Sequence, residues 1–153
     1  MRPLFAALAV CALLTACSRG EPQSGLSTAK IVIDTRGGPA KFNVEIAADE
    51  ASREKGLMYR TTLPSDAGML FEYPAPALVV FWMKNTPLSL DMIFIKQDGT
   101  ISTIAPDTIP YSEDKIPSSE PVRAILEIDG GRAAALGIQP GDKVHGAIFG
   151  NVP

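Results

Sequence analysis

The sequence predicts a mainly β fold: one mostly antiparallel, barrel-like or sandwich domain of about eight strands with two short helices. Its 153 residues are close to the ~150 that serves as a prior for a single domain. The 13 prolines and 13 glycines interrupt the chain too often for a helical bundle. The chain also lacks the regular alternation of strands and long helices that is typical of a parallel, doubly wound sheet.

The first expected strands lie at residues 30–35 and 41–47, on either side of a Gly-Gly-Pro turn. Both segments alternate apolar and polar residues, as a strand buried on one face does. In the second strand, Phe42, Val44 and Ile46 share the apolar face. The two strands are therefore expected to form a hairpin.

A short helix is expected at residues 49–55. Asp49 is a good N-cap, and Gly56 is a good helix stop. Two turns are too few to be stable alone in water, so this helix must lean on the sheet. Leu57 and Met58 are the apolar residues expected to make that contact.

The middle of the chain is expected to add strands at residues 69–73, 78–84, 92–96 and 100–105. The run LVVFWMK at 78–84 is the most apolar of them. Asp-Gly between the last two runs is a strong hairpin signal. These two strands are therefore expected to pair with each other.

The last part of the expected domain begins with a polar loop at residues 106–121, which carries four prolines. The loop is longer than the usual connection in a compact domain, which makes it a candidate functional loop or lid. A strand at 123–128, a second short helix at 130–136 and a final strand at 143–149 follow.

The N-terminal residues 1–16 are expected to be a bacterial signal peptide. The 12 residues from Pro3 to Leu14 carry no charge and are too few to span a bilayer as a helix. The end, Leu14-Thr15-Ala16-Cys17, resembles the lipobox of bacterial lipoproteins, in which the cysteine becomes the acylated first residue. We therefore expect lipidation of Cys17, a flexible tether at residues 17–29 and a single β domain at residues 30–153.

This organisation implies a location and excludes some chemistry. A lipid anchor at Cys17 would attach the domain to a membrane of the bacterial cell envelope, facing the periplasm. Because Ser18 rather than Asp follows the cysteine, the outer membrane is slightly favoured. Cys11 lies inside the expected signal, so the domain has no disulfide, thiolate nucleophile or zinc–cysteine site. The net charge of −3 does not favour a nucleic-acid partner.

A spaced set of short blocks carries a family resemblance. The blocks are EKGLMYR at 54–60, GMLF at 68–71, FWMKNT at 81–86, LDMIFI at 90–95 and DGTI at 98–101, closed by Leu126-Glu127, Gly131 and Gly141-Asp142. Together they resemble the domain of unknown function 192 family of bacterial and archaeal proteins, over almost the whole expected domain. The resemblance implies a compact, mainly β, barrel-like domain, often behind a signal peptide. That family has no settled biochemical activity, so the resemblance assigns no catalytic residue.

The candidate binding site is a polar cluster around the most apolar expected strand. It comprises Arg60, Trp82, Lys84, Asn85, Thr86 and Asp91. Alternation places Val80, Trp82 and Lys84 on one face of the strand and Val79, Phe81 and Met83 on the other. If this strand pairs with the next one, Lys84 and Asp91 meet at the mouth of an apolar barrel, with residues 106–121 as the rim. There Trp82 would form an apolar floor and the polar groups would orient a ligand.

The same residues also fit a purely structural role. Asn85 and Thr86 would hold a turn together, and Lys84 would form a rim salt bridge with Asp91. Arg60 would either hold an anionic group of a substrate or tie a loop to the sheet through Asp91 or Glu127.

On balance the sequence favours a non-catalytic domain that binds a small molecule or an envelope component, with no cofactor and no metal. The alternative is a hydrolase that acts on an envelope polymer through Asp91 or Glu127, although alternation is expected to point Glu127 away from the main core. A second alternative is copper held by the thioethers of Met58, Met69, Met83 and Met92, which suit core packing equally well. The single histidine, His145, cannot make a multi-histidine site, and the sequence carries no indication of oligomeric state.

Overall fold

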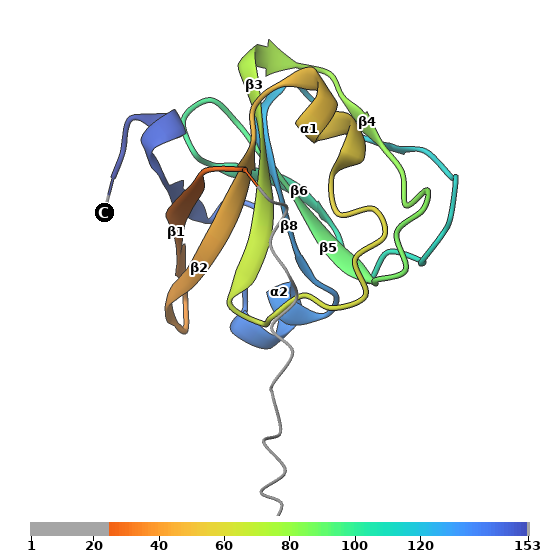
Figure 1. The fold of residues 1–153 in the computed structure, drawn as a ribbon. Coiled ribbons are helices and arrows are strands. Elements are labelled where there is room, and N and C mark those ends of the chain that lie inside the picture. The colour runs from red at the N-terminus through yellow and green to blue at the C-terminus, as the bar shows by residue number, and fades with distance from the viewer. Residues whose placement is uncertain (1–24, 153) are drawn as a thin grey trace, which may run out of the picture.

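The computed structural model describes residues 25–152, so the expected signal peptide, Cys17 and most of the tether lie outside the described residues. The described chain forms a seven-stranded, mostly antiparallel sheet that curves into a half-barrel, a two-stranded sheet and two short α-helices (Figure 1). This confirms the predicted fold class. The strand order in the large sheet is β6-β5-β8-β3-β2-β1-β9, and β4 pairs with β7 in the small one.

The N-terminal half follows the sequence pattern closely. β1 (Thr28–Thr35) and β2 (Gly38–Ala47) form the expected hairpin. α1 (Glu50–Lys55) follows, and the Asp49 side chain caps it by accepting a hydrogen bond from the Ser52 N–H at 2.9 Å. β3 (Ala67–Ala77) then runs parallel to β2, which is the one parallel pairing among the described strands.

The C-terminal half completes the large sheet. β5 (Leu90–Ile95) and β6 (Ile101–Ala105) form the second expected hairpin, and β8 (Val122–Asp129) lies between β5 and β3. α2 (Arg132–Leu136) lies at the lower end of the sheet in Figure 1. β9 (Lys143–His145) then pairs with β1 at the other edge. None of the helices in the part of the chain that the structure describes is long and apolar enough to cross a membrane.

Two predicted strands are shorter than expected. The apolar run at residues 78–84 contains only β4 (Val80–Phe81), which pairs with β7 (Ile116–Pro117) inside the long loop. It therefore makes no hairpin with β5. The expected final strand ends at His145, because a 3-10 turn, η1 (Ala147–Phe149), follows it. The prolines around β4 remove backbone donors, which favours short pairings over a long strand.

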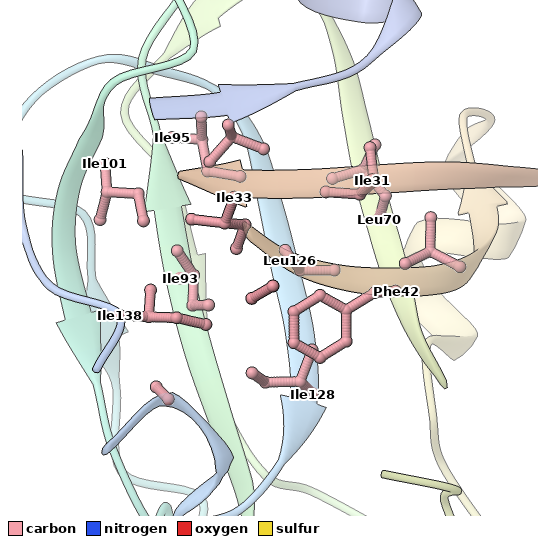
Figure 2. Packing of buried hydrophobic residues seen from close by; sticks show 14 of the residues in the cluster. Ile31, Ile33, Phe42, Leu70, Ile93, Ile95, Ile101, Leu126, Ile128 and Ile138 are labelled. Atoms are coloured by element: carbon pink, nitrogen blue, oxygen red, sulfur yellow. The ribbon is translucent and has the colours of Figure 1, made fainter. Parts of the chain in front are cut away.

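The central strands of the large sheet, β3, β8 and β5, are covered on both faces. The inner face carries an apolar cluster whose side chains converge inside the half-barrel in Figure 2, among them Ile33, Phe42, Ile93 and Leu126. The outer face carries a second cluster that includes Met69, Phe71, Phe94 and Ile125, which α1, β4 and the residues next to them cover. Full burial of one such side chain stabilises a fold by roughly 1.5–3 kcal/mol, so both layers are strongly held.

The two edges of the sheet meet at one end of the half-barrel. The Val144 N–H donates to the Gly99 carbonyl at 2.8 Å, and the Ile101 N–H donates to the Asp142 carbonyl at 2.9 Å. Gly99 has φ +81°, and a Cβ there would lie 2.5 Å from the Val144 oxygen, so this contact requires glycine. Hydrogen bonds from the Thr100 backbone, and then from Lys143, hold the pKa of Asp98 at this junction well below its usual range.

A buried carboxylate ties α2 and the long loop to the sheet. Asp91 in β5 is fully buried, and its Oδ1 accepts hydrogen bonds from the backbone N–H groups of Asp107 at 2.8 Å and Gly131 at 3.0 Å. Its Oδ2 accepts a third from the Ala133 N–H at 2.7 Å. α2 has no capping side chain at its own N-cap, so Asp91 satisfies N–H groups that the first turn leaves unpaired.

Asp91→Asn is expected to destabilise the domain by about 2–4 kcal/mol, because the amide NH₂ would face a backbone N–H and a charge-assisted bond would be lost. Chemical denaturation measures the difference from the wild type. The matched control is Asp66→Asn at an exposed aspartate, which should change stability by less than about 0.5 kcal/mol. Equal stability of the two variants would contradict the anchoring role.

Candidate ligand-binding site

A pocket of about 610 Å³ opens on the outer face of the large sheet. α1 and the residues after it form one side, β4 and residues 82–86 form the other, and side chains from β3 and β8 lie at the base. Figure 1 shows α1 and β4 next to each other over this part of the sheet. The volume falls within the range of small-molecule sites in proteins.

Four aromatic side chains line this pocket: Phe71, Tyr73, Phe81 and Trp82. The Phe71 and Phe81 rings meet edge to face, with centroids 5.0 Å apart. The guanidinium of Arg53 lies over the Tyr73 ring at 5.1 Å, and the ammonium of Lys84 lies over the Trp82 ring at 5.4 Å. The walls therefore combine apolar surface with ring faces that attract positive charge.

Glu127 is the acidic group at the base of the pocket. It lies in β8 directly opposite Met69 of β3 and Met92 of β5, and only 4% of its surface is exposed. Within the described residues no hydrogen bond or ion pair reaches its carboxyl group. Every fully buried side-chain oxygen or nitrogen atom of the described residues has a hydrogen-bond partner. The Glu127 carboxyl has none, so its oxygens must be accessible from the pocket that this residue lines.

Burial raises the pKa of Glu127 to about 8, because the interior penalises the charged form. The expectation that this residue points away from the main core is confirmed, because Leu126 and Ile128 belong to the inner cluster whereas Glu127 lines the pocket on the outer face. The sequence did not reveal that a second apolar cluster covers this outer face, which buries Glu127 there. The alternation of Glu127 with Leu126 and Ile128 was the signal for this functional candidate.

Four of the six predicted site residues line this pocket: Trp82, Lys84, Asn85 and Thr86. The predicted alternation along the run is confirmed. Val79 and Met83 are buried, whereas Val80 and Trp82 are exposed. The sequence pattern thus identified the residues, although the regular strand that was expected to present them is absent there.

The segment that carries these residues is a turn that is hydrogen-bonded to Tyr59, a residue after α1 with a strained backbone. Asn85 has a backbone φ of 56°, and Tyr59 has a φ of 64°. The Tyr59 N–H donates a hydrogen bond to the Asn85 carbonyl at 2.8 Å. The Thr86 N–H donates to the Met83 carbonyl at 3.0 Å. Positive φ is costly for an aromatic residue, and such strain clusters at functional sites, where the surrounding structure maintains it.

Arg60 lies outside the main pocket. Its guanidinium forms a two-fold hydrogen-bonded ion pair with the Glu45 carboxylate, with both N–O distances at 2.7 Å. The two side chains are only 14% and 10% exposed, and they line a separate hollow of about 220 Å³. The partner is thus Glu45 rather than the predicted Asp91 or Glu127, and Arg60 links β2 to the loop after α1.

Asp91 also lies outside the pocket, on the other face of the sheet. In the pairing of β5 with β8, Asp91 is opposite Ile128, and the next pair is Met92 with Glu127. Neighbouring positions of a strand point to opposite faces, so the two carboxyl groups lie on opposite sides of the sheet. The hypothesis of Asp91 and Glu127 as a paired acid and base in one cleft is therefore wrong, and so is the expected meeting of Lys84 with Asp91.

The long loop at residues 106–121 supports the pocket without lining it. The Tyr111 N–H donates to the Thr86 carbonyl at 3.0 Å, and the Met83 N–H donates to the Ser112 carbonyl at 2.9 Å. These two hydrogen bonds fix the turn at residues 83–86 to the loop. The loop therefore positions pocket residues, whereas the sequence suggested that it forms the rim itself.

The four methionines proposed for copper all lie on this side of the sheet. Met69, Met83 and Met92 are fully buried in the outer cluster, and Met58 lines the pocket. The thioether of Met83 accepts a hydrogen bond from the Thr108 hydroxyl at 3.2 Å. Core packing accounts for the three buried side chains. Across residues 25–152, no three His, Cys, Asp or Glu side chains gather in a group that could hold a metal ion.

The curved sheet and the pocket on its outer face define a small β domain with a candidate ligand site. The chain belongs to the DUF192 family, described as uncharacterized ACR, COG1430, whose model matches residues 31–146. This confirms the family resemblance seen in the sequence. A search of curated proteins finds no match.

Two crystal structures of similar proteins share the fold. A Sinorhizobium meliloti 1021 protein, described as a candidate transcription regulator, is 42% identical, with a TM-score of 0.79, covering 83% of this chain and 99% of that chain. A Novosphingobium aromaticivorans DSM 12444 protein of unknown function is 39% identical, with a TM-score of 0.80, covering 92% of this chain and 100% of that chain.

Glu127→Gln is expected to remove a pH dependence of stability. The native pKa of about 8 lies above the ordinary value of 4.5, so the unfolded chain loses its proton first as the pH rises. The wild type should therefore lose stability between these two pH values. At about pH 8 the glutamine variant should be more stable by on the order of 1–3 kcal/mol, and at about pH 4 the two should be similar.

Denaturant unfolding across this pH range measures the effect. Glu54→Gln, at an exposed glutamate on the pocket rim, is the matched control and should keep the wild-type pH profile. If Glu127→Gln also keeps that profile, the carboxyl is not held in its neutral form by burial.

Proposed function

We propose that this protein is a small-molecule-binding domain of the bacterial cell envelope, and that the pocket beneath α1 and β4 is its binding site. The observation that carries this proposal is the convergence on one pocket of Trp82, Lys84, Asn85 and Thr86 with the buried Glu127. A largely preformed pocket with aromatic walls and a few convergent polar groups is the usual form of a ligand site.

Each part of the pocket has a role in this proposal. The aromatic walls supply apolar contact area, and Trp82 is 47% exposed, so its ring is available to a ligand. Lys84 forms no salt bridge within the described residues, which leaves its ammonium available to an anionic group of the ligand at the mouth. Glu127 provides a single ionisable group at the base, where water is largely displaced.

Hydrolysis of an envelope polymer through Glu127 is the second candidate function. The observation in its favour is the burial of an acidic side chain at the base of the pocket, which raises the pKa of Glu127 to about 8 and suits a general acid near neutral pH. Hydrolysis by a carboxylate pair needs a second carboxylate in the same cleft, across the scissile bond from the first. Asp91 faces the other side of the sheet, so this candidate has less support than binding.

The description of the Sinorhizobium relative suggests a regulatory role on nucleic acid. We do not propose that role for this chain, because its net charge of −3 gives no general attraction to phosphate backbones. A regulator that responds to a small molecule through a partner protein would be compatible with the binding proposal.

Trp82→Ala is expected to weaken binding of any ligand found in a thermal-shift screen by about tenfold or more, because a large ring is removed from the pocket wall. Titration calorimetry measures the affinity, and unfolding curves check that the variant is folded. Leu78→Ala is the matched control, since Leu78 is exposed on the same segment but does not line the pocket. Equal affinity of the two variants would contradict the assignment of the site.

Attachment to the membrane through Cys17 is tested separately. We expect the mature protein to begin at Cys17 and to carry the mass of its acyl chains, and we expect Cys17→Ser to appear in the soluble periplasmic fraction. Intact-mass spectrometry and cell fractionation measure these outcomes. A mature chain that retains Met1 and carries no acyl mass would contradict the proposed anchor.

A further inference from the structure

We propose that the ligand of this pocket is an organic cation, whose positively charged nitrogen binds directly to the carboxylate of Glu127. This inference rests on the proposed binding function and names the chemical class of the ligand, a substituted ammonium compound. It follows from three features of the pocket: an acid without a partner, aromatic walls and the distribution of charge around them.

The acid without a partner is the first feature. A buried carboxyl group normally has hydrogen bonds or an opposite charge, and Asp91 on the other face of the same sheet has three backbone N–H donors. Glu127 has no such donor among the described residues, although only 4% of its surface is exposed. Its neighbours on the adjacent strands, Met69 and Met92, are neutral and polarizable. A cationic nitrogen entering the pocket would supply the missing partner.

The aromatic walls are the second feature. Ring faces attract cations through their quadrupole, and pockets that combine several rings recognise substituted ammonium groups in this way. Two rings of this pocket already hold a cation of the protein, Arg53 over Tyr73 and Lys84 over Trp82. Phe71 and Phe81 line the same pocket, hold no cation within the described residues and meet each other edge to face, with Phe71 only 1% exposed. The apolar lining of the pocket is therefore suited to the methyl or methylene groups around a charged nitrogen.

The distribution of charge is the third feature. The ionisable side chains that line the pocket with Glu127 are Glu50, Arg53, Glu54, Lys55, Tyr73 and Lys84. Arg53 also donates to the carbonyls of Ala48 and Glu72, so it is held at the rim. Lys84 lies on a flexible stem and can move aside or contact an anionic arm of the ligand. Burial raises the pKa of Tyr73, which keeps that residue neutral.

Binding of a cation has a proton balance that a neutral ligand lacks. The carboxylic acid of Glu127 gives its proton to solvent, and the resulting carboxylate pairs with the ligand nitrogen, so one proton is released for each cation bound. The native pKa of about 8 means that the acid form predominates in the empty pocket at pH 7. Affinity for a cation with no proton of its own should therefore rise with pH and level off above about pH 8.

The test compares two permanent cations with their uncharged carbon isosteres. Choline is paired with 3,3-dimethylbutan-1-ol, and benzyltrimethylammonium with neopentylbenzene, and each is titrated into the purified protein by calorimetry. We expect the cations to bind about 100-fold more tightly at about pH 9 than at about pH 6, with one proton released below pH 8. The isosteres should bind at least about tenfold more weakly than the cations at the higher pH.

Variants separate this inference from a general effect of charge. Glu127→Gln should lose cation binding and its pH dependence, whereas Glu113→Gln removes the same charge at an exposed position outside the pocket and should keep both. Unfolding curves check that both variants are folded. Equal binding of cation and isostere, an affinity that does not change with pH, or retention by Glu127→Gln would overturn the cation assignment.

Failure of this inference is distinguishable from failure of the binding function. If neither cation binds but other compounds bind and are lost in Trp82→Ala, the pocket is a binding site and the cation assignment is wrong. If the isosteres bind as tightly as the cations and Glu127→Gln retains them, Glu127 acts as a neutral hydrogen-bond donor and the assignment is again wrong. If no compound in a broad screen binds to the pocket, the proposed function fails as well.

Discussion

Burial of both faces of the three central strands, β3, β8 and β5, is the constraint on which the rest of the structure depends. The half-barrel covers one face with its own curvature, and α1, β4 and their neighbouring residues cover the other. Each buried side chain of these strands must therefore be apolar or have a reason to be polar. Asp91 and Glu127 are the two buried carboxyl groups of these strands, and each has a different role.

The contrast between Asp91 and Glu127 shows how the same chemical group takes two roles. Asp91 pairs with Ile128, the neighbour of Glu127 on β8, so the two carboxyl groups point to opposite faces of the sheet. Asp91 meets three backbone N–H groups and joins a helix and a loop to the sheet. Glu127 meets two thioethers and an open pocket. Because its hydrogen bonds are complete, Asp91 has a structural role, whereas Glu127 lacks a partner and is available to a ligand.

The sequence predicts local structure well where the alternation of apolar and polar residues and the residue types at the turns point to the same element. The hairpins β1–β2 and β5–β6 and the cap at Asp49 follow from alternation, an Asp-Gly turn and a capping residue. The run at residues 78–84 is misjudged as a long strand because it is apolar for another reason: it covers the sheet and is not part of it. Alternation places Glu127 on the correct face, but its burial there could not be predicted, because alternation alone does not reveal how many faces a strand buries. The pairing of Arg60 with Glu45 depends on the route of the loop after α1, which no local pattern encodes.

The junction between β9 and the β5–β6 turn has a consequence for how the chain reaches its native state. It joins Lys143 to Asp98, 45 residues earlier, while His145 contacts Asp34, 111 residues earlier. Until these last residues are available, β1 and β6 are open edges that can add strands from other molecules. A nascent chain is therefore prone to aggregation until β9 is in place, so pairing of β9, rather than formation of the first hairpins, closes these edges.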